Sequence, residues 1–152
     1  MSRRALSTLA AGLALAAALA SPGQPSQLAS DAKCLKPRTA LVKAIKSGLR
    51  VKARGKLRKA RAVKARPLTG FAPRGFKKGT YFVSAKMRGF GIATWAADRP
   101  AYNTGGGLII SVGRVARRVS TLGVDIPRST LEAWGLTTHT RGYAASRRCV
   151  RK

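Results

Sequence analysis

The excess of basic over acidic residues constrains the possible folds of this chain more than any other feature does. It has 31 Lys and Arg but 4 Asp and Glu, which gives a formal net charge of +27 across 152 residues. Few of these cations can find a carboxylate, so a fold must keep them apart at its surface. Hydrophobic residues still make up 45% of the chain, which is too many for a disordered basic tail. Length and apolar content together predict one globular domain.

Residues 1–20 have the three parts of a secretory signal peptide. Arg3 and Arg4 form a basic start, residues 5–20 carry no charge, and Ala18-Leu19-Ala20 is a small-x-small cleavage site. A helix of residues 5–20 would span about 24 Å, short of the ~30 Å hydrocarbon core, which argues against a membrane anchor. We therefore expect a secreted or envelope-associated protein that is cleaved after Ala20. The general secretory route is favoured, and the arginine pair leaves the twin-arginine route open.

The mature chain is expected to be a short lead-in followed by one domain that two cysteines close. Residues 21–33 are rich in Ser, Pro and Gln, which predicts a disordered lead-in. Residues 34–152 form the predicted domain, with Cys34 at its start and Cys149 near its end. Paired cysteines persist as disulfides outside the cell, so we expect a Cys34–Cys149 bridge. A reactive or metal-binding thiol pair is the alternative, but the chain has no CxxC motif and no second ligand pair.

A helix and a basic strand are predicted at the start of the domain. Residues 37–48 place Leu41 and Ile45 at helical spacing, and Gly48 suits a left-handed stop. Residues 50–58 alternate strictly between cations and small or apolar residues, which predicts a strand with all its cations on one face. Residues 59–66 either extend this strand or form a helix.

The middle of the chain predicts an antiparallel hairpin followed by a buried strand. An aromatic and β-branched run at residues 80–87 and an apolar run at 91–96 flank a turn. Residues 108–112 are apolar throughout, as in a central strand. The segments rich in Pro and Gly before and after the hairpin are predicted to be loops, at 67–79 and 97–107.

Short helices are predicted in the C-terminal part. Residues 113–122 have helical apolar spacing, and Ser129 with Glu132 forms a capping box for a helix at 130–134. Residues 141–149 fit a last helical segment. The predicted fold class is therefore α+β: a single small domain with an antiparallel sheet of about four strands, an N-terminal helix and short C-terminal helices.

Side chains suited to catalysis are scarce. His139 is the one histidine, and neither a second histidine nor a Gly-x-Ser-x-Gly motif is present, so we expect it to be a loop or surface residue. Asp31, Asp98, Asp125 and Glu132 lie in the lead-in or at ends of elements, where carboxylates satisfy backbone donors. A carboxylic acid pair would need one protonated member, which a strongly positive field disfavours. We expect no enzyme, cofactor or metal site, and loss of an activity on His139→Ala or Asp98→Ala would reverse that view.

Aromatic side chains could stack nucleic-acid bases, but core packing is the favoured interpretation. Most of them fall within predicted elements beside other apolar residues, and no RNA-recognition, KH or zinc-finger signature is present. These residues are Trp95, Trp134, Tyr81, Tyr102, Tyr143 and Phe82.

The distribution of charge leads to a functional hypothesis. Every charged residue from Lys33 to Arg66 is Lys or Arg. A polyanion would relieve this self-repulsion, and the candidates are cell wall, an anionic membrane surface or extracellular nucleic acid, with salt-sensitive, sequence-independent binding. The alternative is a protein-partner or small-ligand module of the cell envelope, such as an inhibitor, with charge used only for retention. The expected polyanion-binding residues are Arg50, Lys52, Arg54, Lys56, Arg58, Lys59, Arg61, Lys64 and Arg66.

The chain also resembles small uncharacterised exported proteins of actinobacteria. The similarity lies in the Ala/Leu signal, a Cys before a short helix (Cys34, then Ala40–Leu49), the run Tyr81–Met87, the run Ala93–Ala96 and the late pair Cys149-Val150. It covers most of the mature chain and implies no known activity. The basicity of this chain exceeds what that group would lead us to expect.

Overall fold

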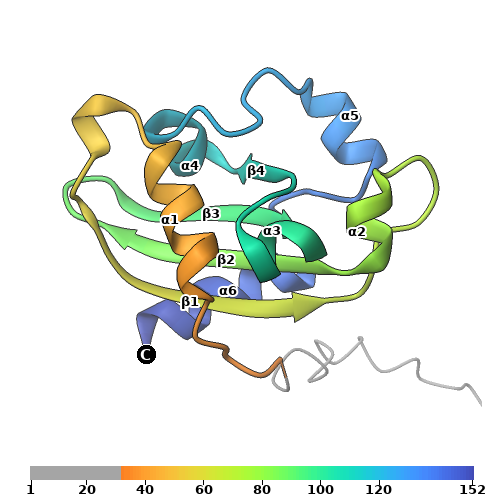
Figure 1. Ribbon diagram of the computed structural model, residues 1–152, viewed down its shortest axis with the longest axis horizontal. Coiled ribbons are helices and arrows are strands. Elements are labelled where there is room, and N and C mark those ends of the chain that lie inside the picture. The colour runs from red at the N-terminus through yellow and green to blue at the C-terminus, as the bar shows by residue number, and fades with distance from the viewer. Residues whose placement is uncertain (1–31) are drawn as a thin grey trace, which may run out of the picture.

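An antiparallel sheet with the strand order β1-β2-β3-β4 forms the centre of the protein (Figure 1). In this computed structural model, residues 32–152 are described, so the predicted signal peptide and all but the last two residues of the lead-in lie outside the described residues. The strands are β1 (Leu57–Ala65), β2 (Thr80–Met87), β3 (Gly91–Asp98) and β4 (Ile109–Val112). The α+β prediction is confirmed, including the N-terminal helix and the short C-terminal helices. The helices are α1 (Thr39–Ser47), the 3-10 helix η2 (Val51–Ala53), α2 (Arg74–Lys78), α3 (Arg99–Thr104), α4 (Arg114–Val119), α5 (Arg128–Ala133) and α6 (Arg141–Arg151).

Helices cover both faces of the sheet. Figure 1 shows α1 in front of the strands and α6 behind them. On the first face, Leu41 and Ile45 of α1 pack in one cluster with Trp95 of β3. On the opposite face, Val63 of β1 packs against Cys149 and its neighbours in α6. A sheet buried on both faces explains why β2 and β3 are nearly continuous apolar runs rather than alternating ones.

The basic strand predicted at residues 50–58 is wrong at its start, because β1 begins at Leu57. Residues 51–53 form η2 instead, and the Arg50 N–H donates to the carbonyl of Val119, 2.9 Å away. Leu49 and Ala53 are buried, but Val51 between them is exposed, which does not fit a strand in which residues 49, 51 and 53 would share one face. The segment left open at 59–66 is strand as far as Ala65.

A bulge in β1 changes which way its cations point. Leu57 lies opposite Met87 but Ala60 lies opposite Ala85, so β1 has one extra residue in this interval. After the bulge, Arg61 faces the α6 side with its partner Ser84, and successive residues alternate between the two faces. The cations of β1 are therefore shared between both faces of an edge strand, a distribution that discourages pairing with other chains.

Several turns and caps differ from the sequence prediction. The predicted loops at 67–79 and 97–107 contain the short helices α2 and α3. The prediction of a capping box formed by Ser129 and Glu132 is also wrong, because Pro127 is the N-cap of α5 and Ser129 lies inside the helix. Gly48 ends α1 with an ordinary φ of −83°, so it is no left-handed stop. A side chain at this position would instead collide with Leu122.

The predicted disulfide between Cys34 and Cys149 is present. It joins residues 115 apart in sequence and ties the segment before α1 to α6. Next to it, Leu35 and Ala62 exchange two backbone hydrogen bonds of 2.8 Å, so this segment covers part of the outer edge of β1. Within residues 32–152, no helix is long and apolar enough to cross a membrane.

Buried hydroxyl groups join α6 to the sheet. The Ser84 hydroxyl in β2 lies 2.8 Å from the hydroxyl of Thr94 in β3 and 2.8 Å from that of Ser146 in α6. All three side chains are buried. Each buried hydroxyl therefore has a partner, which avoids the cost of an unpaired polar group and fixes where α6 sits on β2 and β3.

We expect Gly142→Ala in α6 to destabilise the protein by about 1–3 kcal/mol, because it overpacks a filled core. Alanine normally stabilises a helix relative to glycine. Here a Cβ would press on the ring of Phe82 and on the Cβ of Ala65, both of which belong to the packed face of the sheet. Urea unfolding measures the change. Adding Phe82→Leu to the variant should recover part of the loss, and a more stable Gly142→Ala protein would contradict this packing.

Candidate functional site

The cations expected to bind polyanions fall into two groups rather than on one face. The basic segment, Arg50 to Lys56, lies at the end of the sheet where β2 turns into β3, at the left of Figure 1. The remaining predicted cations follow β1 and its end, and all of them are exposed or half-buried. We call these the β1 cations: Arg58, Lys59, Arg61, Lys64 and Arg66.

Phe90, in the turn between β2 and β3, connects the basic segment to α4. The Arg88 N–H donates to the carbonyl of Lys56 at 2.9 Å, which holds the turn against the basic segment. The Lys56 ammonium lies 5.1 Å from the centre of the Phe90 ring, and the Arg118 guanidinium of α4 lies 5.9 Å from it. Both distances suit cation–π attraction, so one ring positions two cations that are far apart in sequence.

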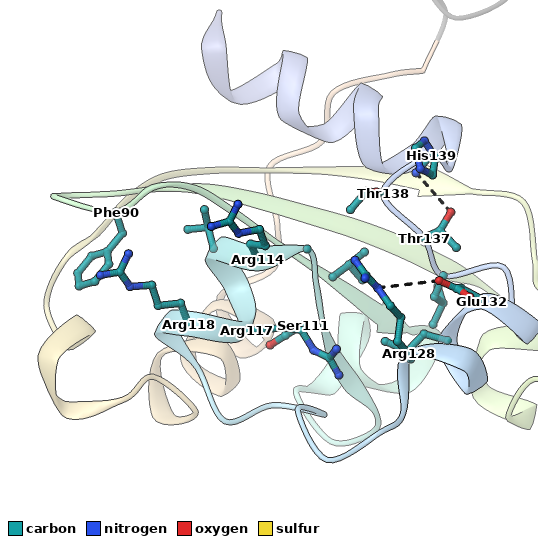
Figure 2. A pocket seen from close by; sticks show the side chains of 15 residues that line it. Phe90, Ser111, Arg114, Arg117, Arg118, Arg128, Glu132, Thr137, Thr138 and His139 are labelled. Carbon is teal, nitrogen blue, oxygen red and sulfur yellow. Dashed lines mark hydrogen bonds and ion pairs between the residues drawn. The ribbon is translucent and has the colours of Figure 1, made fainter.

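A cavity of about 1040 Å³ opens between α4, α5 and the loop before α6 (Figure 2). Phe90 lies at one end, and four arginines line the walls: Arg114, Arg117, Arg118 and Arg128. We call this space the arginine cavity. Arg114 comes from α4 and Arg128 from α5, and both line this cavity together with Thr138 of the loop before α6 (Figure 2). The sequence analysis did not assign any of these residues to a site.

The four arginines of the cavity are engaged to different degrees. Arg117 points away from the space, and its guanidinium donates to the carbonyls of Ile126 at 2.8 Å and Val124 at 3.3 Å. Arg118 rests on Phe90. Within the part of the chain that the structure describes, the guanidinium of Arg114 has no hydrogen bond, ion pair or cation–π contact. Arg114 and Arg118 are therefore open to a ligand, while Arg117 maintains the wall.

One carboxylate lies among the residues that line the cavity. Glu132 sits one helical turn after Arg128, with 3.9 Å between its carboxylate oxygen and the Arg128 Nε. The two side chains are 60% and 80% exposed, so this ion pair is weak and screened by solvent. The lining keeps an excess of positive charge, and guanidinium groups match the geometry of phosphate and carboxylate oxygens.

His139 and Asp98, the two residues on which an enzyme would depend, have different surroundings. His139 is exposed in the loop before α6, as predicted, and lines the arginine cavity. Asp98 is buried and caps α3 by accepting a 2.8 Å hydrogen bond from the Ala101 N–H. It is absent from the lining of the arginine cavity. Residues 32–152 contain no group of three His, Cys, Asp or Glu side chains that could hold a metal ion.

Most of the aromatic residues pack in the core, as the sequence analysis predicted when it favoured core packing over base stacking. Trp95 and Phe82 are fully buried. Tyr81 and Tyr102 stack on each other with ring centres 3.8 Å apart. Burial raises the pKa of the Tyr102 phenol, and Tyr81 adds to the rise while Arg38 opposes it. Phe90 is the aromatic residue beside the candidate site, and sequence reasoning placed it in a turn without a role.

Comparison with known proteins identifies no relative. No protein-family model, curated protein or solved structure matches the chain. The resemblance to exported actinobacterial proteins stays an expectation from the sequence, and function has to be inferred from the charges and the cavity.

Proposed function

We propose that the protein is an exported, non-enzymatic basic domain that binds phosphate-rich polyanions. Its unbalanced surface charge carries this proposal. All Lys and Arg other than Arg3 and Arg4 lie within residues 32–152, and none of them is buried. The carboxylates in the same range are Asp98, Asp125 and Glu132, and Asp98 is used as a helix cap. A polyanion would supply the counter-charge that the chain itself lacks.

The disulfide supports a location outside the reducing interior of the cell. Disulfides such as Cys34–Cys149 persist in secreted and envelope proteins. The polyanions met there are phosphate polymers of the cell wall, anionic lipid surfaces and released nucleic acid. All three present phosphates, and the basic segment and the β1 cations offer exposed contacts to such a surface.

The alternative function is a small-ligand or partner-binding module in which the charge serves retention. The cavity of about 1040 Å³ favours this alternative, because it is a concave site of ligand size. The two functions respond differently to loss of surface charge. Neutralising the basic segment should weaken a polyanion binder and leave a module of the second kind with its ligand affinity intact.

Salt should weaken polymer binding steeply. If six to ten phosphates are contacted, affinity for DNA should fall by roughly 10³–10⁵-fold between 50 and 200 mM salt. Elution of the oxidised protein from purified cell wall and from immobilised DNA across a salt gradient measures this. High-salt elution from both supports a general polyanion binder, and wall retention alone indicates a wall phosphate polymer. Elution from both at low salt would contradict the proposal.

Neutralising the basic segment should reduce the salt dependence itself. In Lys52→Gln/Arg54→Gln/Lys56→Gln, the slope of log affinity for DNA against log salt should fall by about 2–3, because each phosphate contact contributes about 0.9. The matched control is a triple glutamine variant in α2, at the opposite end of the molecule in Figure 1: Arg74, Lys77 and Lys78. An equal loss in both variants would mean that net charge, and not this surface, determines binding.

A further inference from the structure

We infer that the cavity between α4, α5 and the loop before α6 binds a small organic phosphate, as a single saturable site distinct from polymer binding. Arg114 and Arg118 project from α4 four residues apart, so they lie on one side of that helix. Arg128 enters from α5, and Thr138 and His139 line the space from the loop. Donors therefore converge from three separate segments onto one volume.

Convergent arginines fit a phosphate group better than a carboxylate. A guanidinium forms paired, charge-assisted hydrogen bonds with two oxygens of the same group. A terminal phosphate presents three oxygens in different directions, so it can engage arginines from two helices at once. A carboxylate has two oxygens in one plane, so it offers fewer acceptor directions to arginines that approach from two helices. Glu132 contacts Arg128 at Nε, which leaves both terminal nitrogens of that guanidinium for a ligand.

The walls of the cavity are held in place before any ligand arrives. The two hydrogen bonds from Arg117 to residues 124 and 126 attach α4 to the turn that leads into α5. The cation–π contact of Arg118 with Phe90, 5.9 Å from the ring centre, restrains a second arginine at the other end. A ligand would therefore meet a wall and one arginine, Arg118, whose positions are already restricted, which lowers part of the entropic cost of binding.

The size and lining of the cavity call for an organic group in addition to phosphate. Its volume of about 1040 Å³ slightly exceeds the usual range for ligand pockets, about 300–1,000 Å³, and is far above the size of inorganic phosphate. Val112, Val115, Leu131 and Leu136 contribute apolar lining beside the arginines. The ligand class is thus a phosphate ester whose organic part rests on this apolar lining.

Isothermal titration calorimetry with phenyl phosphate, inorganic phosphate and benzoate tests this inference. We expect one phenyl phosphate per chain, with at least tenfold weaker binding of inorganic phosphate, which lacks the ring, and of benzoate, which lacks the phosphate. Arg114→Gln/Arg128→Gln should weaken phenyl phosphate binding at least tenfold. Glu132→Gln should strengthen it, because it removes the carboxylate from the lining. Binding of many phenyl phosphates per chain without saturation would overturn the inference.

The basic-segment variant and the single histidine provide independent controls. Lys52→Gln/Arg54→Gln, which keeps the contact between Lys56 and Phe90, should bind phenyl phosphate within twofold of the parent, so failure of polymer binding and failure of this site are distinguishable. His139 is the one histidine in the chain and lines the cavity, so its ring proton signals in NMR report on the site in the unaltered protein. These signals should shift with saturation on adding phenyl phosphate. Unchanged His139 signals would overturn the inference even if an arginine variant failed to fold.

Discussion

Replacing Cys34 and Cys149 together with serine should lower the free energy of unfolding by about 4–5 kcal/mol, because the unfolded chain regains the freedom that the cross-link removes. The bridge spans a sequence separation of 115, so the loop that it closes is most of the domain. The free energy of unfolding of a small domain is about 5–15 kcal/mol in total, so this change is a large share of the stability. Urea unfolding of the oxidised protein and of the double variant measures the difference.

The same substitution should also have a local effect that hydrogen exchange can detect. Without the bridge, the pairing of Leu35 with Ala62 is the remaining backbone link of the first described segment to β1. The amide of Ala62 should then exchange faster, whereas amides of β2 and β3 should change only as much as the global stability does. A loss of stability below about 1 kcal/mol, with unchanged exchange at Ala62, would contradict the role given to the disulfide.

Trp95→Ala should destabilise the protein by about 3–5 kcal/mol, the usual cost of truncating a large buried aromatic. Trp95 is fully buried between the sheet and α4, and its indole N–H donates to the Ser120 hydroxyl at 3.1 Å. That hydroxyl lies 2.7 Å from the hydroxyl of Ser111. Removal of the indole thus opens a cavity and deprives a buried hydroxyl network of one of its members.

Trp134→Ala is the matched control for this core position. Trp134 follows α5 and is half-buried, so its loss should cost less than half as much. Trp95→Phe should fall between the two, because it keeps most of the apolar volume but loses the indole donor. Thermal and urea unfolding of the three variants provide the comparison. Equal costs for Trp95→Ala and Trp134→Ala would show that Trp95 does not anchor the core.

The hairpin of β2 and β3 could be predicted because neighbouring residues in the sequence specify it. A run of aromatic and β-branched residues, three turn residues and a second apolar run specify two paired strands without reference to the rest of the chain. The helix α3 could also have been predicted from the sequence. Asp98 is a suitable N-cap residue, and Pro100 suits the first turn of a helix. The prediction of a loop there gave too much weight to the glycines that follow.

The start of β1 could not be predicted, because distant contacts decide it. Residues 50–58 alternate as a strand would, but Leu49 pairs with Ser120 and the Arg50 N–H bonds to Val119. These partners lie some 70 residues away, and they turn the chain into η2 before the strand begins. The alternation of cations with small or apolar residues in this segment therefore did not indicate a strand conformation at its start.

The candidate site was predictable in charge but not in position. Counting Lys and Arg indicates an anionic partner whatever the fold. The cavity, however, is assembled from the β2–β3 turn, α4, α5 and the loop at residues 136–139. No spacing within any one of these segments shows that Phe90 will meet Arg118, or that Arg114 and Arg128 will line one cavity. Both arrangements arise from the packing of the helices on the sheet.

The link between Cys34 and Cys149 also has a mechanical consequence. If the domain is pulled by its two ends, tension passes from residue 34 to residue 149 through the covalent bridge. The sheet and its helices lie inside the closed loop and bear almost none of that load. A pulling experiment should therefore show no extension from unfolding while the bridge is oxidised, and release most of the length of the domain once it is reduced.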